Sequence, residues 1–106
     1  MAAQRSGMTV LLKGAATVIA SFDGGTSLFA ALYDRRAPWL GTAGAGDVLA
    51  GMITGLVAGH GARAHFHDRI AAAAWLHAEA ARHFGPALIA DDIADQIPDV
   101  LRTLGY

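Results

Sequence analysis

The sequence contains no cysteine and few charged side chains, and each scarcity excludes a class of protein. Without cysteine there is neither a disulfide framework nor a thiolate metal site, and we expect a cytoplasmic protein. Eight Lys and Arg side chains and a net charge of −1 argue against a nucleic-acid surface. The uncharged stretch Val48–Ala62 is shorter than the roughly 20 apolar residues of a membrane span. The first residues lack the apolar segment of a secretory signal.

What the sequence does contain is a large apolar fraction. Hydrophobic residues make up 54% of the 106 residues, and glycine occurs 13 times. This composition is typical of a soluble globular protein, and the length allows one domain at most, residues 1–106. So many apolar side chains with so few charges indicate that part of the surface faces other protein. An oligomer partner or a missing half-domain would both account for this.

The segment Leu40–Gly51 reads LGTAGAGDVLAG, a turn of small residues that runs into an apolar helical pattern. Small residues let backbone N–H groups approach a ligand closely, and a helix leaves its first amides unpaired at the positive end of its dipole. Such a place binds phosphate or stabilises a developing oxyanion. Asp47 follows in the first helical turn, where a carboxylate either caps the helix or does chemistry. Residue chemistry alone leaves both interpretations open.

Two familiar phosphate-binding motifs do not fit this turn. Gly41 and Gly46 have the spacing of a G-x-x-x-x-G-K-[ST] loop, but Asp47 stands where the lysine belongs. Leu49 occupies the place of the third glycine in a dinucleotide fingerprint. A carboxylate in place of the lysine indicates a base that acts on a hydroxyl beside the phosphates, rather than a cation that holds them.

Short β-branched and aliphatic runs predict strands in the first third of the chain. The expected strands are Thr9–Lys13, Thr17–Ser21 and Ser27–Tyr33, and the third is expected to form a hairpin with the second. Strands followed by helices would make an α+β arrangement if these residues stood alone.

Apolar residues recur in pairs four apart from Asp47 to about Gly59, which predicts a helix. Three glycines form a bare ridge beside this stripe: Gly51, Gly55 and Gly59. Glycine costs about 1 kcal/mol per helix position relative to alanine. Close packing of the helix on a sheet is the interpretation we favour, and a ligand against the helix is the alternative.

Two further helices are expected in the last third. Asp68 is a candidate N-cap for a helix that ends at Phe84, before Gly85 and Pro86. The last helical segment is expected to start at Asp91 or Asp92, and Pro98 is expected to divide it, starting a second short helix.

The glycine turn and an upstream segment together resemble one enzyme family. GTAGAGDVLAG resembles the G-[ST/A]-G-D-V-L-A-G signature of the ADP/ATP-dependent NAD(P)H-hydrate dehydratases, which belong to the ribokinase-like superfamily. Val10–Ala20, VLLKGAATVIA, resembles the same family's L-K-G-x-x-T-[VI]-I-A segment. Ala43 and Ala45 stand where many relatives have Gly and Ser, which removes a hydroxyl donor but leaves the backbone amides.

The resemblance covers nearly all of this chain but only the C-terminal part of the family's domain. It implies an α/β fold: the C-terminal portion of a ribokinase-like domain, with short strands and a hairpin followed by packed helices. The anion site would then be present, while much of the pocket for the acceptor hydroxyl would be missing. We therefore expect the isolated 106 residues to be inactive and to form homo-oligomers, or to associate with a missing N-terminal half.

The resemblance also implies a nucleotide-dependent repair reaction. The hydroxyl of hydrated NADH or NADPH would be phosphorylated at the expense of ADP or ATP, with Mg²⁺ bridging the phosphates, and phosphate would then be eliminated. Asp47 would contact the substrate and act as catalytic base, beside an anion hole formed by the amides of Gly44, Ala45 and Gly46. The nucleotide would be held by Lys13, Gly14, Ala15, Ala16, Thr17 and Gly46.

Other functions stay open. A sugar or vitamin-precursor kinase of the same superfamily would use the same base and anion hole, although the V-L-A-G continuation after Asp47 favours the dehydratase. A nucleotide-binding module without turnover is also compatible with so short a chain. Without the resemblance, Lys13 would be read as an exposed lysine at a strand end.

The histidines of the chain could be interpreted as metal ligands, but their spacing does not favour a metal site. His65, His67 and Asp68 lie close together, but no H-E-x-x-H helix or second ligand group accompanies them. His77 and His83 are six positions apart on one predicted helix, so they do not share a face. We expect no protein-held metal site, and a solvated loop ahead of a helix is the better interpretation of the first group.

Overall fold

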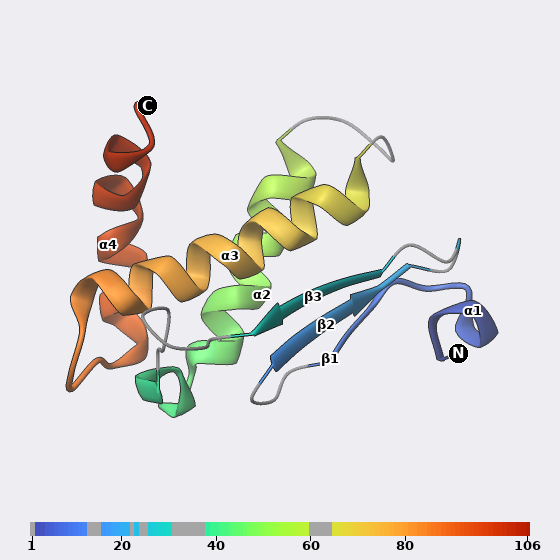
Figure 1. Ribbon diagram of the computed structural model, residues 1–106, viewed down its shortest axis with the longest axis horizontal. Helices are drawn as coiled ribbons and strands as arrows, with labels where there is room; N and C mark the ends of the chain where they lie inside the picture. The colour runs from blue at the N-terminus through green and yellow to red at the C-terminus, as the bar shows by residue number, and fades with distance from the viewer. Residues whose placement is uncertain (1, 13–15, 22, 24–25, 31–37, 60–64) are drawn as a thin grey trace.

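The computed structural model describes residues 2–12, 16–21, 23, 26–30, 38–59 and 65–106. A three-stranded sheet comes first and is followed by packed helices (Figure 1). The elements are α1 Ala2–Ser6, β1 Val10–Leu12, β2 Ala16–Ala20, β3 Thr26–Ala30, the 3₁₀ helix η2 Pro38–Gly41, α2 Ala45–Ala58, α3 Phe66–Phe84 and α4 Ala90–Thr103. Of the helices that the structure describes, none combines the length and apolarity needed to cross a membrane.

The three strands pair antiparallel in the order β1-β2-β3. Leu12 pairs with Val18, and Val18 pairs in turn with Leu28 of the third strand. The expected hairpin between the second and third strands is therefore confirmed, and each of these strands begins one residue earlier than the sequence predicts. The predicted end of the first strand at Lys13, and the predicted end of the third strand after Ala30, lie outside the described residues.

One face of the sheet is covered by α3. Ile19 is completely buried in a small apolar cluster with Ile70 and Ala74 of α3. Leu12 and Val18 alternate with the buried positions along their strands and are 66% and 36% exposed. The described part of the chain thus leaves apolar side chains uncovered on the sheet's second face.

The helix α3 is the centre of the molecule, because the sheet, α2 and α4 all contact it (Figure 1). Its alanines at 73, 80 and 81 are almost completely buried, and such small side chains let neighbouring backbones approach closely. The main core cluster joins the start of α2 to α3 and α4, with Ala45, Ala80, Ala81, Leu88, Ile93 and Val100 as its buried members.

The helix α3 begins earlier than the sequence indicates. His65 precedes it in the left-handed conformation, with φ 61°, and Asp68 lies in its first turn rather than at its N-cap. The prediction of an Asp68 cap is therefore wrong; a carboxylate in the first turn instead faces the positive end of the helix dipole. The predicted end at Phe84 is confirmed, and Gly85 follows with φ +91°.

The helix α4 runs uninterrupted through Pro98, so the predicted division is wrong. Pro98 costs about 3 kcal/mol in a helix interior, because it lacks an N–H and clashes with the preceding turn. Ile93 and Val100 lie on either side of it and are buried in the same core cluster, which offsets that cost. The helix starts at Ala90, and the Asp92 carboxylate accepts a 2.9 Å hydrogen bond from the Ile89 amide. The helix thus starts one residue before Asp91, and Asp92 is the N3 residue of a capping box whose N-cap is Ile89.

The order of short strands, a hairpin and packed helices agrees with expectation. The described strands are all antiparallel, so a parallel α/β sheet is not seen in this part of the chain.

Candidate functional site

The glycine turn leads from η2 into α2, as the sequence indicates. Gly44 is the N-cap of α2 and has φ +87°, a left-handed conformation that only glycine adopts without strain. A Cβ atom added to Gly44 would lie 3.2 Å from the Cβ of Ala90. The start of α4 therefore packs against the turn, and both the backbone conformation and the space require glycine at this position.

The backbone amides of the turn differ in their partners. The Thr42 amide donates to the Trp39 carbonyl at 3.1 Å, and the Ala45 amide donates to the Thr42 carbonyl at 3.3 Å. The amides of Gly44, Gly46 and Asp47 have no backbone acceptor within the described residues. Of the predicted anion-hole amides, those of Gly44 and Gly46 are thus available to a ligand, while that of Ala45 already has a long hydrogen bond.

Asp47 is the third residue of α2, in its first turn, and its side chain is exposed. The N-cap of α2 is Gly44, and no side chain makes a capping hydrogen bond at this end of the helix. The capping interpretation of Asp47 therefore has no support in the geometry. A solvent-facing carboxylate remains beside unengaged amides, an arrangement in which a base can meet a hydroxyl close to an anion.

The predicted nucleotide segment is only partly described. Lys13, Gly14 and Ala15 lie outside the described residues. Ala16 begins β2, and Thr17, whose side chain is half-buried, follows it. In the view of Figure 1 the start of β2 and the start of α2 lie toward the same end of the molecule. Their roles toward a nucleotide stay predictions.

The glycine ridge of α2 does not pack on the sheet. Cβ atoms added to Gly51 and Gly55 would meet nothing within 4 Å, and both residues are exposed. The expectation of close helix–sheet packing is wrong for the described residues, because α2 turns its apolar stripe, not its glycines, toward α3 and α4.

This contrast between glycines gives a stability prediction. Gly44→Ala is expected to lower the free energy of unfolding by roughly 1–2 kcal/mol, since alanine is strained at positive φ and its methyl group would crowd Ala90. Gly51→Ala is the matched control and is expected to raise stability by up to about 1 kcal/mol, because it improves helix propensity in open space. Urea unfolding of both variants is the measurement. Equal effects of the two substitutions would contradict the assigned backbone conformation.

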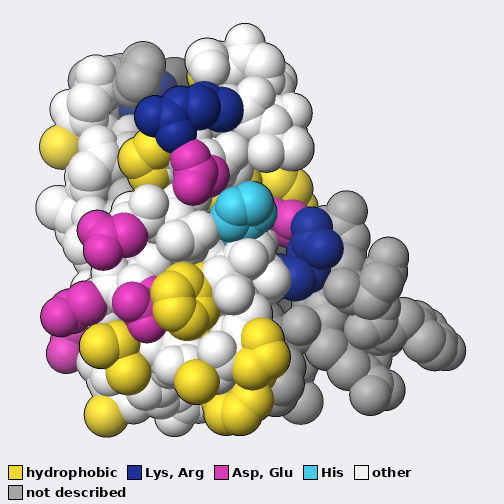
Figure 2. Space-filling model, turned by 90° about the vertical axis from the view of Figure 1, so that its left-hand side faces the viewer, with side chains coloured by type: hydrophobic (Ala, Val, Ile, Leu, Met, Phe, Trp, Pro, Cys, Tyr) yellow, Lys and Arg dark blue, Asp and Glu magenta, His cyan; other side chains and the backbone are white. Residues whose placement is uncertain are grey.

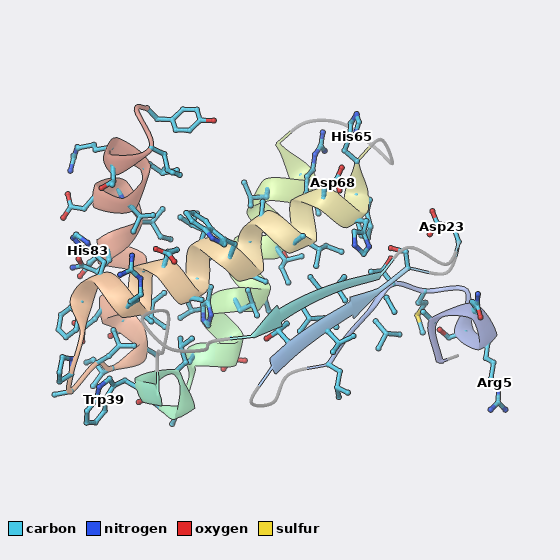
Figure 3. The ribbon with its side chains drawn as sticks, in the orientation of Figure 1. Arg5, Asp23, Trp39, His65, Asp68 and His83 are labelled. Atoms are coloured by element: carbon cyan, nitrogen blue, oxygen red, sulfur yellow. The ribbon has the colours of Figure 1, made fainter. Side chains whose placement is uncertain are left out.

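The two histidines at the start of α3, His65 and His67, contact different side chains. His65 and Asp68 are both exposed, with 3.6 Å between the imidazole Nδ1 and the carboxylate (Figure 3). The His67 Nδ1 lies 2.6 Å from the Oγ of the buried Ser21, which joins α3 to the end of β2. Among the described residues no three potential ligands come together around a metal position.

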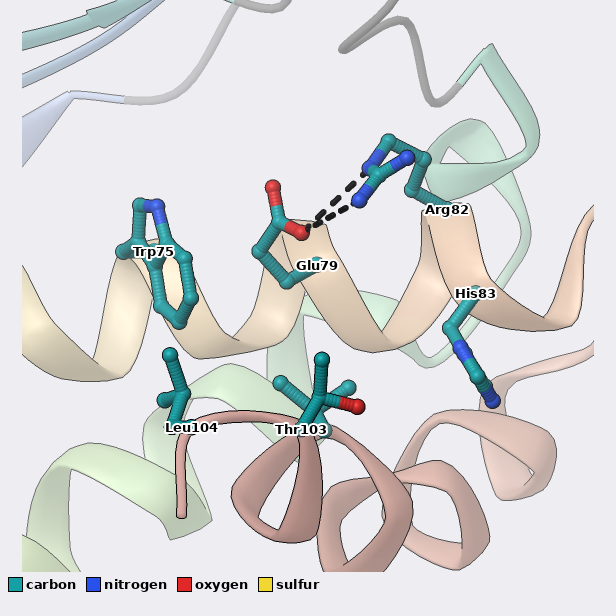
Figure 4. A pocket seen from close by; sticks show the side chains of 7 residues that line it. Trp75, Glu79, Arg82, His83, Thr103 and Leu104 are labelled. Carbon is teal, nitrogen blue, oxygen red and sulfur yellow. Dashed lines mark hydrogen bonds and ion pairs between the residues drawn. The ribbon is translucent and has the colours of Figure 1, made fainter.

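A pocket of about 150 Å³ lies between α3 and α4, and no residue of the glycine turn lines it (Figure 4). The Arg82 guanidinium donates to the Glu79 carboxylate at 2.8 Å across its rim. The pocket is lined by Trp75, Glu79, Arg82, His83, Val100, Thr103 and Leu104. Figure 2 shows acidic side chains on the face that α4 presents, and α4 carries Asp91, Asp92, Asp95 and Asp99. The excess of acidic over basic side chains on α4 does not favour an anionic ligand at this helix.

The sequence did not predict a role for His77, which contacts the start of α2. His77 of α3 is buried, and its Nε2 lies 2.8 Å from the carbonyl oxygen of Ala45, the first residue of α2. A single histidine within a run of alanines on a buried helix face was the available signal, because a polar side chain there must find a partner.

Comparisons with known proteins agree on one family. A family model described as NAD(P)H-hydrate dehydratase matches residues 1–99. The ADP-dependent (S)-NAD(P)H-hydrate dehydratase of Cenarchaeum symbiosum is 36% identical over 104 residues, which covers 94% of this chain and 33% of that protein. No solved structure shows significant similarity to the chain.

Two bacterial relatives carry the name bifunctional NAD(P)H-hydrate repair enzyme Nnr. The protein of Moorella thermoacetica is 45% identical over 102 residues, 90% of this chain and 18% of the relative. The protein of Synechocystis is 47% identical over 72 residues, 68% of this chain and 13% of the relative. The chain thus spans a third or less of the length of the curated relatives it matches.

Proposed function

Because the chain belongs to the NAD(P)H-hydrate dehydratase family, we propose that it carries the base and the anion hole of an ADP-dependent NAD(P)H-hydrate dehydratase. The observation that supports this most is the start of α2, where the exposed Asp47 carboxylate stands beside the unengaged amides of Gly44 and Gly46. We propose ADP rather than ATP as the phosphate donor, because the archaeal relative is named ADP-dependent and its match covers 94% of this chain.

In the proposed reaction Asp47 accepts the proton of the substrate hydroxyl as that oxygen attacks the terminal phosphorus of the nucleotide. The bond between this phosphorus and the bridging oxygen of ADP breaks, and AMP leaves. The amides of Gly44 and Gly46 stabilise the negative charge of the phosphoryl group in transfer. The Ala45 amide contributes only if it shares its 3.3 Å bond to Thr42. Elimination of phosphate then regenerates NADH or NADPH.

Magnesium is proposed to arrive with the nucleotide. Within the described residues no cluster of carboxylates is built for a metal, and Asp47 is the carboxylate that the turn itself offers. Mg²⁺ is commonly held by one or two carboxylates together with substrate phosphates. It would neutralise phosphate charge during the transfer, while the protein positions the hydroxyl and the amides.

The proposal also assigns the chain to the C-terminal part of a ribokinase-like α/β domain. Leu12 and Val18 expose apolar surface on the sheet, which further chain or a second copy would cover. Trp39, 45% exposed next to the turn, is suited to border an adenine ring (Figure 3).

Mass-spectrometric turnover tests this function. The full gene product that carries the chain should convert hydrated NADH to NADH with ADP, and release AMP and phosphate in equal amounts. Accumulation of a stable phosphorylated product would instead indicate a small-molecule kinase. Binding of ADP without any product would indicate a module without turnover, and either result would overturn the dehydratase proposal.

Lys13 is the chain's one lysine, and the proposal gives it a nucleotide phosphate as partner. Lys13→Ala is expected to weaken ADP binding by roughly 1–3 kcal/mol, the loss of a charge-assisted hydrogen bond. Thr17→Ala should cost less, because its hydroxyl carries no charge. Calorimetric titration with ADP and with AMP is the measurement. An unchanged dissociation constant for ADP would mean that Lys13 is an ordinary exposed lysine and does not contact a nucleotide phosphate.

A further inference from the structure

His77 is a polar side chain in an apolar environment. It is 2% exposed, and the alanines on its face of α3, at 73, 80 and 81, are equally buried. Burying an imidazole is costly unless its nitrogens are hydrogen-bonded. Its Nε2 lies 2.8 Å from the Ala45 carbonyl oxygen, which can only accept, so Nε2 carries the hydrogen and donates it.

The acceptor of this hydrogen bond is notable for its position. Ala45 stands between Gly44 and Gly46 and is two residues before Asp47. Ala45 is the first residue of α2, so the regular helical hydrogen bond to its carbonyl comes from the Leu49 amide. The carbonyl therefore does not need the imidazole to satisfy its hydrogen bonding. The side chains of the turn itself are too small to anchor it.

We infer that His77 is a positioning residue for the anion site, holding the first residue of α2 so that the Gly44 and Gly46 amides and the Asp47 carboxylate keep a fixed geometry. The inference rests on the function proposed above. Preorganised donors stabilise transition-state charge only when they are held at hydrogen-bond distance, and a displacement of about 1 Å can cost roughly 100-fold in rate. Loss of the hydrogen bond should therefore act on kcat more than on the KM for ADP.

Replacing His77 by glutamine and by asparagine, whose side chains differ in length by one methylene group, tests the role of this hydrogen bond. The Nε2 of His77→Gln can occupy the place of the imidazole Nε2 and donate to Ala45, whereas the amide of His77→Asn is too short. In the full gene product, kcat should fall roughly 10- to 100-fold in His77→Asn. His77→Gln should stay within about threefold of wild type, because its donor is retained. The KM for ADP should be little changed in both. A purely structural role would lower the folded fraction of both variants, without separating kcat from KM.

Two measurements do not depend on turnover. Nitrogen chemical shifts of the wild-type protein should show His77 in the Nε2–H form; the Nδ1–H form would overturn the inference. Amide hydrogen exchange at 44–47 should be faster in His77→Asn than in wild type or His77→Gln, and equal exchange in all three would also overturn it. Asp47→Asn separates the two claims. Full turnover in that variant refutes the proposed base, whereas wild-type kcat and exchange in His77→Asn refute the role of His77 alone.

Discussion

Asp47→Asn is expected to lower the rate of ADP-dependent dehydration by roughly 10²–10⁴-fold, while the fold and ADP binding stay nearly unchanged. Asparagine has almost the same shape as aspartate but cannot accept the hydroxyl proton. The exposed Asp47 side chain supports no core packing, and no cap is lost with it, since Gly44 is the N-cap of α2. Steady-state turnover of the full gene product, with an ADP titration of each variant, is the measurement.

The chain offers a matched control for this substitution. Asp68 is the third residue of α3, as Asp47 is of α2, and it too is exposed in the first turn. Asp68→Asn removes the same favourable interaction with a helix dipole, worth about 0.3–1 kcal/mol, but lies away from the glycine turn. It should leave turnover intact. Equal losses in both variants would mean that Asp47 acts through helix stability and not as a base.

The second large effect is expected on stability. Ile93→Ala should lower the free energy of unfolding by about 2–5 kcal/mol, because Ile93 is completely buried in the core cluster that joins α2, α3 and α4. Ile89, four residues earlier, is 57% exposed, and Ile89→Ala should cost less than about 0.5 kcal/mol.

Urea unfolding of the two isoleucine variants measures this difference. Since the same cluster contains Ala45, at the start of α2, Ile93→Ala should also disturb the glycine turn. Similar costs for Ile93→Ala and Ile89→Ala would contradict the packing of α4 against the rest of the molecule.

Local patterns predicted much of this fold. The paired apolar residues of α2 marked a helix that the structure begins only two positions earlier, at Ala45, and the end of α3 at Gly85 followed from its glycine. The glycine turn and Asp47 could be identified as a candidate site because small residues, a helix start and a misplaced carboxylate all lie within a few positions of one another.

The predictions that were wrong concern features that depend on contacts between residues far apart in the sequence. Pro98 was expected to divide α4, but Ile93 and Val100 hold both halves in one core. The ridge at Gly51 and Gly55 was expected to pack on the sheet, yet α2 presents a different face to its neighbours. The hydrogen bond from His77 to Ala45 spans 32 positions, and no local pattern specifies it.

The most direct measurement of the proposed chemistry is a single turnover of hydrated NADH with ADP, comparing wild type with Asp47→Asn by mass spectrometry. Wild type should form NADH and AMP in equal amounts. The asparagine variant should bind ADP with unchanged affinity and form neither product on the same timescale. Formation of AMP and NADH by the Asp47→Asn variant at the wild-type rate would contradict the assignment of Asp47 as the base.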